Sequence, residues 1–171
     1  MKDTLLVKLE NIKATVWITF NFPKWADNHT ALTKNDSELA DEMVRKCFYN
    51  TSIALGSSFK RRGKNIKRGL KIPYYAVPEV FAKGGVTKRP LHYHSGANVE
   101  ESRLERFAAV MSIKWENICR YNFPRSEPKP LWMRKIDRVD PEYWNQPEKY
   151  SIENCLVDNA WARSRIIFTQ F

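Results

Sequence analysis

The order of helix-type and strand-type segments along the chain is the feature that most constrains its fold. Apolar residues recur at intervals of three and four over residues 36–54 and again over 98–120, a period that predicts two amphipathic helices. Between these helices lie two strand-type runs joined by Gly84-Gly85, which is the signal of a hairpin turn. Strands joined by hairpins, with helices between them, indicate an α+β fold.

Five segments are predicted to form strands: residues 14–20, 72–81, 90–95, 131–139 and 165–170. The first is β-branched and aromatic, which suits a central strand. The second contains Pro73 and Pro78, which places it at a sheet edge or at a bulge. We therefore expect one domain over residues 1–171, built as a central antiparallel β-sheet with helices packed on one face.

Composition excludes several classes of protein. The chain has 171 residues, 43% of them hydrophobic, yet no apolar run approaches the roughly 20 residues that span a bilayer. Charged residues interrupt the apolar residues of the N-terminus, unlike in a signal peptide. Cys47, Cys119 and Cys155 are too few for a disulfide framework and lack zinc-site spacing. These features predict a soluble, cytoplasmic protein with no membrane partner.

The positive charge is concentrated in one part of the chain. The net charge is +10, and residues 59–94 carry ten basic residues with Glu79 as the single acidic one. The like charges of such a block repel one another, and binding to a polyanion relieves that repulsion. Gly63 and Gly69 disfavour a long helix in this segment. We interpret it as an exposed basic loop or ribbon that contacts nucleic-acid phosphates. The predicted contact residues are Lys60, Arg61, Arg62, Lys64, Lys67, Arg68, Lys71, Lys88 and Arg89.

Two of the three histidines occur as His92-Tyr93-His94. In a strand, residues two apart point to the same face, so both imidazoles can share one metal ion. A hairpin turn near Gly84-Gly85 is expected to pair Glu79 with position 91 or 92, about 5 Å away on the same face. A carboxylate and two imidazoles suit Mn²⁺ or Mg²⁺. The same pattern would arise if the two histidines lay on a solvent-exposed face of the sheet and Glu79 formed a salt bridge with Lys88 or Arg89.

These motifs, in this order, resemble those of the Rep-type HUH endonucleases, the nicking initiators of rolling-circle replication in plasmids and phages, which are related to relaxases. The first family motif is a hydrophobic strand with a Thr-x-x-Pro-like end, matched by residues 19–23. The second is His-hydrophobic-His, matched by His92 to His94, and many members have an acidic ligand on the preceding strand, a role open to Glu79. The resemblance covers residues from about 15 to about 118 and extends at most to about 157.

The resemblance implies metal-dependent nicking of DNA, single-stranded or in an origin hairpin, through a tyrosine nucleophile. The family tyrosine lies on a helix and is often followed three residues later by Lys. Here the candidate is Tyr150, on a helix expected to start near Pro147, with Glu153 at the Lys position; Tyr143 is the second candidate. The implied chemistry makes Trp17, Trp25 and Tyr75 candidates for base stacking, although such residues are more often part of a core.

Three other functions fit the sequence. A binding module of the same fold could recognise an origin without cutting it. An RNA-binding α+β domain would explain the charge but not the histidine pair. A metal-dependent hydrolase unrelated to the family would explain the histidines. Metal binding separates the RNA-binding domain from the others, and a covalent protein–DNA adduct separates the nickase from all of them.

Overall fold

The computed structural model describes residues 2–23, 34–61, 63–81, 88–139, 142, 145–156 and 160–169. Its helices are α1 (Lys2–Glu10), α2 (Lys34–Leu55), the 3₁₀ turn η1 (Glu101–Arg103), α3 (Leu104–Asn122), α4 (Pro147–Tyr150), the π-helix η3 (Ser151–Leu156) and α5 (Ala160–Ser164). Its strands are β1 (Val16–Asn21), β2 (Ser57–Arg61), β3 (Lys64–Arg68), β4 (Tyr74–Phe81), β5 (Lys88–Ala97), β6 (Trp132–Lys135) and β7 (Ile167–Phe168).

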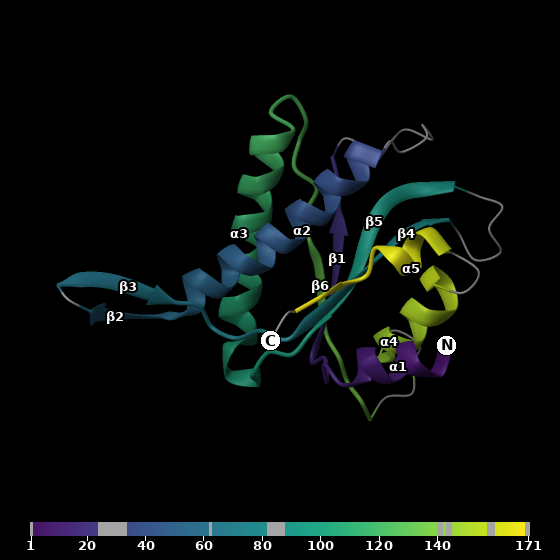
Figure 1. Cartoon of the computed structure of the whole chain (residues 1–171), viewed down its shortest axis with the longest axis horizontal. Coiled ribbons are helices and arrows are strands. Elements are labelled where there is room, and N and C mark those ends of the chain that lie inside the picture. The colour runs from purple at the N-terminus through teal and green to yellow at the C-terminus, as the bar shows by residue number, and fades with distance from the viewer. Residues whose placement is uncertain are drawn as a thin grey trace.

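The main sheet has five antiparallel strands in the order β6-β1-β5-β4-β7, and the α+β prediction is confirmed (Figure 1). The strand with the histidine pair, β5, lies at its centre between β1 and β4. Both long helices form where the three-to-four spacing predicts them. The N-terminal helix α1 and the short helix α5 were not predicted, since neither segment is long enough to show a clear period.

Helices cover both faces of the sheet, so the expectation of helices on one face is wrong. On one face, α2 and α3 pack on Val16, Ile18 and Phe20 of β1 and on Tyr93 of β5. The other face carries Trp17, Tyr75 and Val77 and is covered by α1, η3 and α5 (Figure 1). Each central strand therefore has two buried faces, which explains why its sequence does not alternate between apolar and polar residues.

The prolines of this segment predict a sheet edge or a bulge, and β4 has both features. The short β7 pairs only with Tyr75 and Ala76, so Pro78 lies in the part of β4 that β7 does not reach. The register with β5 shifts between Glu79 and Phe81, which is a bulge-type irregularity. The predicted turn at Gly84-Gly85 lies outside the described residues, as does Trp25.

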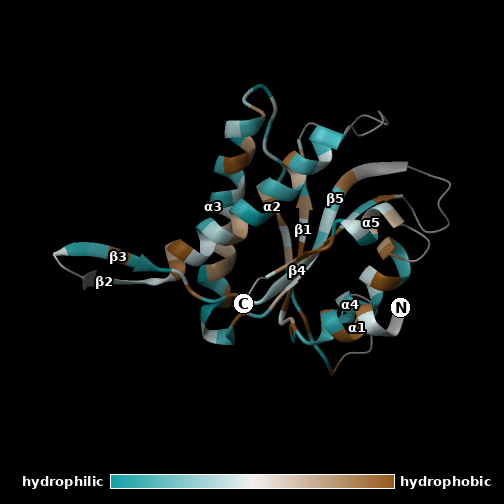
Figure 2. Cartoon of the chain, viewed as in Figure 1, coloured by the Kyte–Doolittle hydropathy of each residue, from teal (hydrophilic) through white to brown (hydrophobic). Residues whose placement is uncertain are grey.

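The basic segment forms a separate two-stranded ribbon, β2–β3, that extends from the body of the molecule (Figure 1). All five residues of β3 are exposed, and Figure 2 shows the hydrophilic colour over most of this strand, interrupted by one hydrophobic stretch. The ribbon is joined to α2 at its base, where Ser52 Oγ donates to the Leu70 carbonyl at 2.6 Å and the Leu70 amide donates to the Ser52 carbonyl at 2.9 Å. The predicted ribbon is confirmed, with a fixed base.

No helix in the described part of the chain is both long enough and apolar enough to cross a membrane. The three cysteines are buried and free of disulfides.

We expect Gly56→Ala to disturb the base of the ribbon. A Cβ at Gly56 would lie 1.9 Å from the backbone oxygen of Arg68, so the two chain segments must move apart at a cost of about 1–3 kcal/mol in the free energy of unfolding. Hydrogen exchange measures the effect at the Leu70 amide, which should lose protection. The control is Gly63→Ala. A Cβ there meets nothing within 4 Å, and the strain from its φ of +76° is confined to the turn between β2 and β3, so the Leu70 amide should stay protected. Unchanged protection of Leu70 in Gly56→Ala would contradict the account.

Candidate active site

The pairing of β4 with β5 brings the three predicted ligands together. Glu79 lies directly opposite His92, and Val77 lies opposite His94. The Glu79 Oε2 atom is 3.0 Å from His92 Nε2 and 2.8 Å from His94 Nε2. The prediction that Glu79, His92 and His94 converge is confirmed, and the pairing of Glu79 with Lys88 or Arg89 is not needed to explain this carboxylate.

The site lies on the face of the sheet covered by the short helices, and it is nearly enclosed. Only 2% of Glu79 is exposed. Burial raises the pKa of Glu79, but the hydrogen bonds and positive charge of His92 and His94 outweigh it and lower the pKa from 4.5 to about 2. Glu79 is therefore a carboxylate at neutral pH, and a buried carboxylate is stable only beside positive charge.

Strand β1 orients the second histidine. Thr19 pairs with His94 across the ladder, and Thr19 Oγ1 lies 3.4 Å from His94 Nδ1. The Trp17 ring packs edge-on to the His94 ring, with centroids 5.7 Å apart. A partner on one ring nitrogen fixes the orientation of a histidine and presents the other nitrogen to a ligand. For His94 the presented atom is Nε2, which faces Glu79.

Tyr150 reaches the same site from the helical layer. Helix α4 begins at Pro147, as predicted. Tyr150 Oη donates to Glu79 Oε2 at 3.3 Å, and its ring lies 4.8 Å from the His94 ring and 5.1 Å from the Trp17 ring, between centroids. The second tyrosine candidate, Tyr143, lies outside the described residues.

Helix α4 is held in place by an ion pair that sequence reasoning missed. Arg138 donates to both carboxylate oxygens of Glu148, at 2.9 and 2.7 Å, and to the Ala14 carbonyl at 2.9 Å. The Glu148 side chain is 5% exposed and that of Arg138 is 49% exposed. A bidentate pair of this kind fixes both position and orientation. It links the segment after β6 to Glu148, two residues before Tyr150, and no local spacing signals it.

Cys155 is the other site residue that sequence reasoning missed. Its Sγ lies 3.9 Å from Glu79 Oε2, and the ligand atoms of Glu79, His94 and Cys155 lie within 4.8 Å of one another, so this buried group can hold a metal ion. Cys155 belongs to η3, whose π-helical bonds join residues five apart. This wider turn brings Cys155 back to the side of Tyr150, which an α-helical reading of the sequence does not predict.

The donor spacing fits a metal ion. Two ligands at right angles, each about 2.1 Å from a cation in octahedral geometry, lie about 3.0 Å from each other. The separations of 2.8 and 3.0 Å between Glu79 Oε2 and the two imidazole nitrogens are hydrogen-bond distances that are also compatible with this value. The ligand atoms that all lie within 4.8 Å of one another belong to Glu79, His94 and Cys155. The buried, ionised Glu79 also supplies negative charge that a cation balances.

The structure describes the side chains of some predicted nucleic-acid contacts and not those of others. Lys64, Lys67, Arg68 and Lys71 are exposed on or beside β3. Arg62 lies outside the described residues, and the side chains of Lys60, Arg61, Lys88 and Arg89 lie outside the described part of the chain. Two of the three candidates for base stacking are buried: Trp17 is 5% exposed and Tyr75 is 0% exposed. The expectation that these two stack on bases is wrong, because both belong to the core.

Comparisons with known proteins find no match: no family model fits the sequence, and neither the curated proteins nor the solved structures contain a significant match. The resemblance to the HUH endonucleases accordingly stays a prediction from the sequence motifs.

We expect Arg138→Ala to lower the free energy of unfolding by about 1–3 kcal/mol, because it leaves the buried Glu148 carboxylate without its bidentate partner. Chemical denaturation measures the change. Arg120→Ala is the matched control, since Arg120 also makes two bonds to a glutamate, Glu116, but both side chains are exposed. Its cost should be at most about 0.5 kcal/mol. Equal losses in the two variants would show that the Arg138 pair does not anchor α4.

Proposed function

We propose that the protein is a replication-initiator-like DNA-binding protein that nicks single-stranded DNA, with a divalent metal at Glu79, His92 and His94 and with Tyr150 as nucleophile. One observation carries the proposal: Tyr150 Oη lies 3.3 Å from the Glu79 oxygen that also contacts both imidazoles. A phosphate that approaches this metal site therefore comes within reach of a tyrosine hydroxyl.

The metal in this proposal is Mg²⁺ or Mn²⁺. A carboxylate with two imidazoles suits Mn²⁺ in particular, and both ions bind in octahedral geometry through oxygen and nitrogen ligands. When bound, the ion supplies positive charge to a non-bridging oxygen of the scissile phosphate. His92 lies at the more open side of the site, with 14% of its side chain exposed compared with 2% for Glu79, and we place the entry of the phosphate there.

The proposed reaction is a phosphodiester transfer. Tyr150 Oη forms a bond to phosphorus, and the bond from phosphorus to the 3′ oxygen breaks. The phenol proton passes to solvent and the leaving 3′ oxygen takes one up, which yields a 5′-phosphotyrosine and a free 3′-hydroxyl. A tyrosine hydroxyl ordinarily titrates near pH 10, so positive charge at the site and at the adjacent Lys149 favours the attacking phenolate.

The basic ribbon holds the DNA in this proposal. Its exposed cations lie on a two-stranded element whose base is bonded to α2. Because this element is already folded, its cations can contact the phosphate backbone without a further cost of ordering the chain. Phosphate contacts provide affinity but no sequence information. The DNA is single-stranded at the site, or belongs to an origin hairpin.

A second candidate is a non-catalytic DNA-binding module of the same fold. It is favoured by Glu153, which stands at the position where the family often has Lys. An acidic group there weakens the positive charge that helps a phenolate and a phosphate to meet.

We expect wild-type protein incubated with single-stranded oligonucleotides and Mn²⁺ to form a covalent adduct, and Tyr150→Phe to form none. The substitution keeps the ring that packs on Trp17 and His94 and removes only the attacking oxygen. A denaturing gel detects the adduct, and DNA binding measured in parallel should change less than about threefold. Removal of Mn²⁺ with a chelator should also abolish the adduct.

Tyr49→Phe is the matched control, because Tyr49 is 66% exposed on α2 and lies on the other side of the sheet; it should form the adduct normally. If Tyr150→Phe still forms an adduct, the nucleophile is another residue, with Tyr143→Phe as the next variant. If the wild type forms none with any single-stranded substrate, the binding module becomes the better account.

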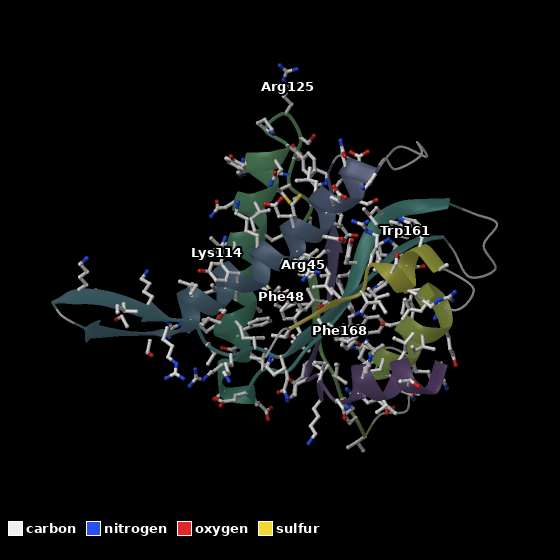
Figure 3. All side chains as sticks on the ribbon, viewed as in Figure 1. Arg45, Phe48, Lys114, Arg125, Trp161 and Phe168 are labelled. Carbon is white, nitrogen blue, oxygen red and sulfur yellow. The ribbon has the colours of Figure 1, made fainter. Side chains whose placement is uncertain are left out.

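Replacing Lys64, Lys67 and Arg68 together with Ala should weaken DNA binding and flatten its salt dependence. Each lost phosphate contact lowers the slope of log affinity against log salt by about 0.7 for a single strand. The control replaces Arg106, Arg125 and Lys129, three cations outside the ribbon (Figure 3 shows Arg125 at the loop after α3). An unchanged slope in the ribbon variant would remove the ribbon from the interface.

A further inference from the structure

We propose that the site takes a second class of metal, a thiophilic ion such as Zn²⁺, with Cys155 as an additional ligand, and that this form is closed to the phosphate. The inference rests on the proposed function, since it concerns the regulation of the same site. It would make Zn²⁺ an inhibitor of the reaction that Mn²⁺ or Mg²⁺ supports.

The position of Cys155 is the first support. Cys155 Sγ lies 3.9 Å from Glu79 Oε2, and with ligand bonds of about 2.3 Å to sulfur and about 2.0 Å to oxygen, two tetrahedral ligands are about 3.5 Å apart. For this pair of atoms the difference is a few tenths of an ångström. Cys155 is 1% exposed and belongs to the short helices that cover the site.

The chemistry of the donor set is the second support. Oxygen and imidazole ligands suit Mg²⁺ and Mn²⁺, whereas a thiolate selects softer ions. Glu79, His94 and Cys155 have ligand atoms within 4.8 Å of one another, and His92 Nε2, 3.0 Å from Glu79 Oε2, would be the fourth ligand of a tetrahedral Zn²⁺. When the sulfur–zinc bond forms, the thiol proton passes to solvent.

The number of ligands explains why the zinc form should be inactive. Catalytic zinc sites keep one position open for water or substrate, and sites with four protein ligands do not. An octahedral ion held by Glu79 and the two histidines alone keeps positions for phosphate oxygens and water. The same residues therefore form an open site with a hard cation and a closed site with zinc.

The other two cysteines provide matched controls. Cys47 and Cys119 are equally buried, but both lie in the core between α2, α3 and the opposite face of the sheet. Cys47 Sγ contacts the Met111 carbonyl at 3.7 Å. Neither thiol can reach the site through the sheet.

The test uses Co²⁺, which replaces Zn²⁺ and reports a bound thiolate through a charge-transfer absorption in the near ultraviolet. We expect this band in the metal-free full chain titrated with Co²⁺, and in Cys47→Ser and Cys119→Ser. It should be lost in Cys155→Ser and Cys155→Ala, which should also bind Zn²⁺ about tenfold or more weakly while their Mn²⁺ affinity changes less than about threefold. Circular dichroism checks that each variant is folded, and the alanine variant provides a second chance if serine disturbs the site.

A wild-type protein that binds Co²⁺ without the band, or a band that persists in both Cys155 variants, would overturn the inference. In the nicking assay, Zn²⁺ should compete with Mn²⁺ in the wild type and much less in Cys155→Ala. The spectroscopic result does not depend on nicking. If no adduct forms but the band follows Cys155, the thiolate site stands and the proposed nicking activity falls.

Discussion

The site depends on the register of one strand pair, β4 with β5. Glu79 lies opposite His92, and the alternation of side chains then brings His94 to the same carboxylate. A slip of one residue would turn Glu79 toward the apolar core under α2 and α3, and a buried charge without a partner costs several kcal/mol. The register is therefore coupled to the packing of the whole sheet, since both faces of β4 and β5 are buried.

Side chains on both faces of the sheet fix the position of strand β5, which carries the two histidines. Tyr93, between the two histidines, points to the opposite face and donates its hydroxyl to Asp41 of α2, which also accepts a bond from Arg165 at 2.7 Å. On the site face, Thr19 and Trp17 of β1 fix the His94 ring. A central strand with ordered partners on both faces gives its imidazoles little freedom, and a metal or phosphate site requires such preorganisation.

The short helices have a different function from the long ones. Helices α2 and α3 bury one face of the sheet with aromatic residues such as Phe20 and Trp115, whose rings lie 5.0 Å apart between centroids, and they form most of the core. The α4–η3 segment, anchored by Arg138 and Glu148, brings a hydroxyl and a thiol to the carboxylate of Glu79. The long helices thus form most of the core, and the short ones place a hydroxyl and a thiol beside Glu79.

Local pattern in the sequence determined the two long helices and the antiparallel pairing of β4 with β5, because periodicity and turn signals act over a few residues. It predicted that Glu79 meets the histidine pair but left its partner open between positions 91 and 92, and the irregularity between Glu79 and Phe81 decides the register in favour of His92. Tertiary structure alone decided the rest. Cys155 reaches the site through a π-helical turn, and Arg138 meets Glu148 across an irregular segment, so neither contact follows from a spacing. Trp17 and Tyr75 became core residues because short helices cover the second face of the sheet, and burial depends on which segments meet in three dimensions.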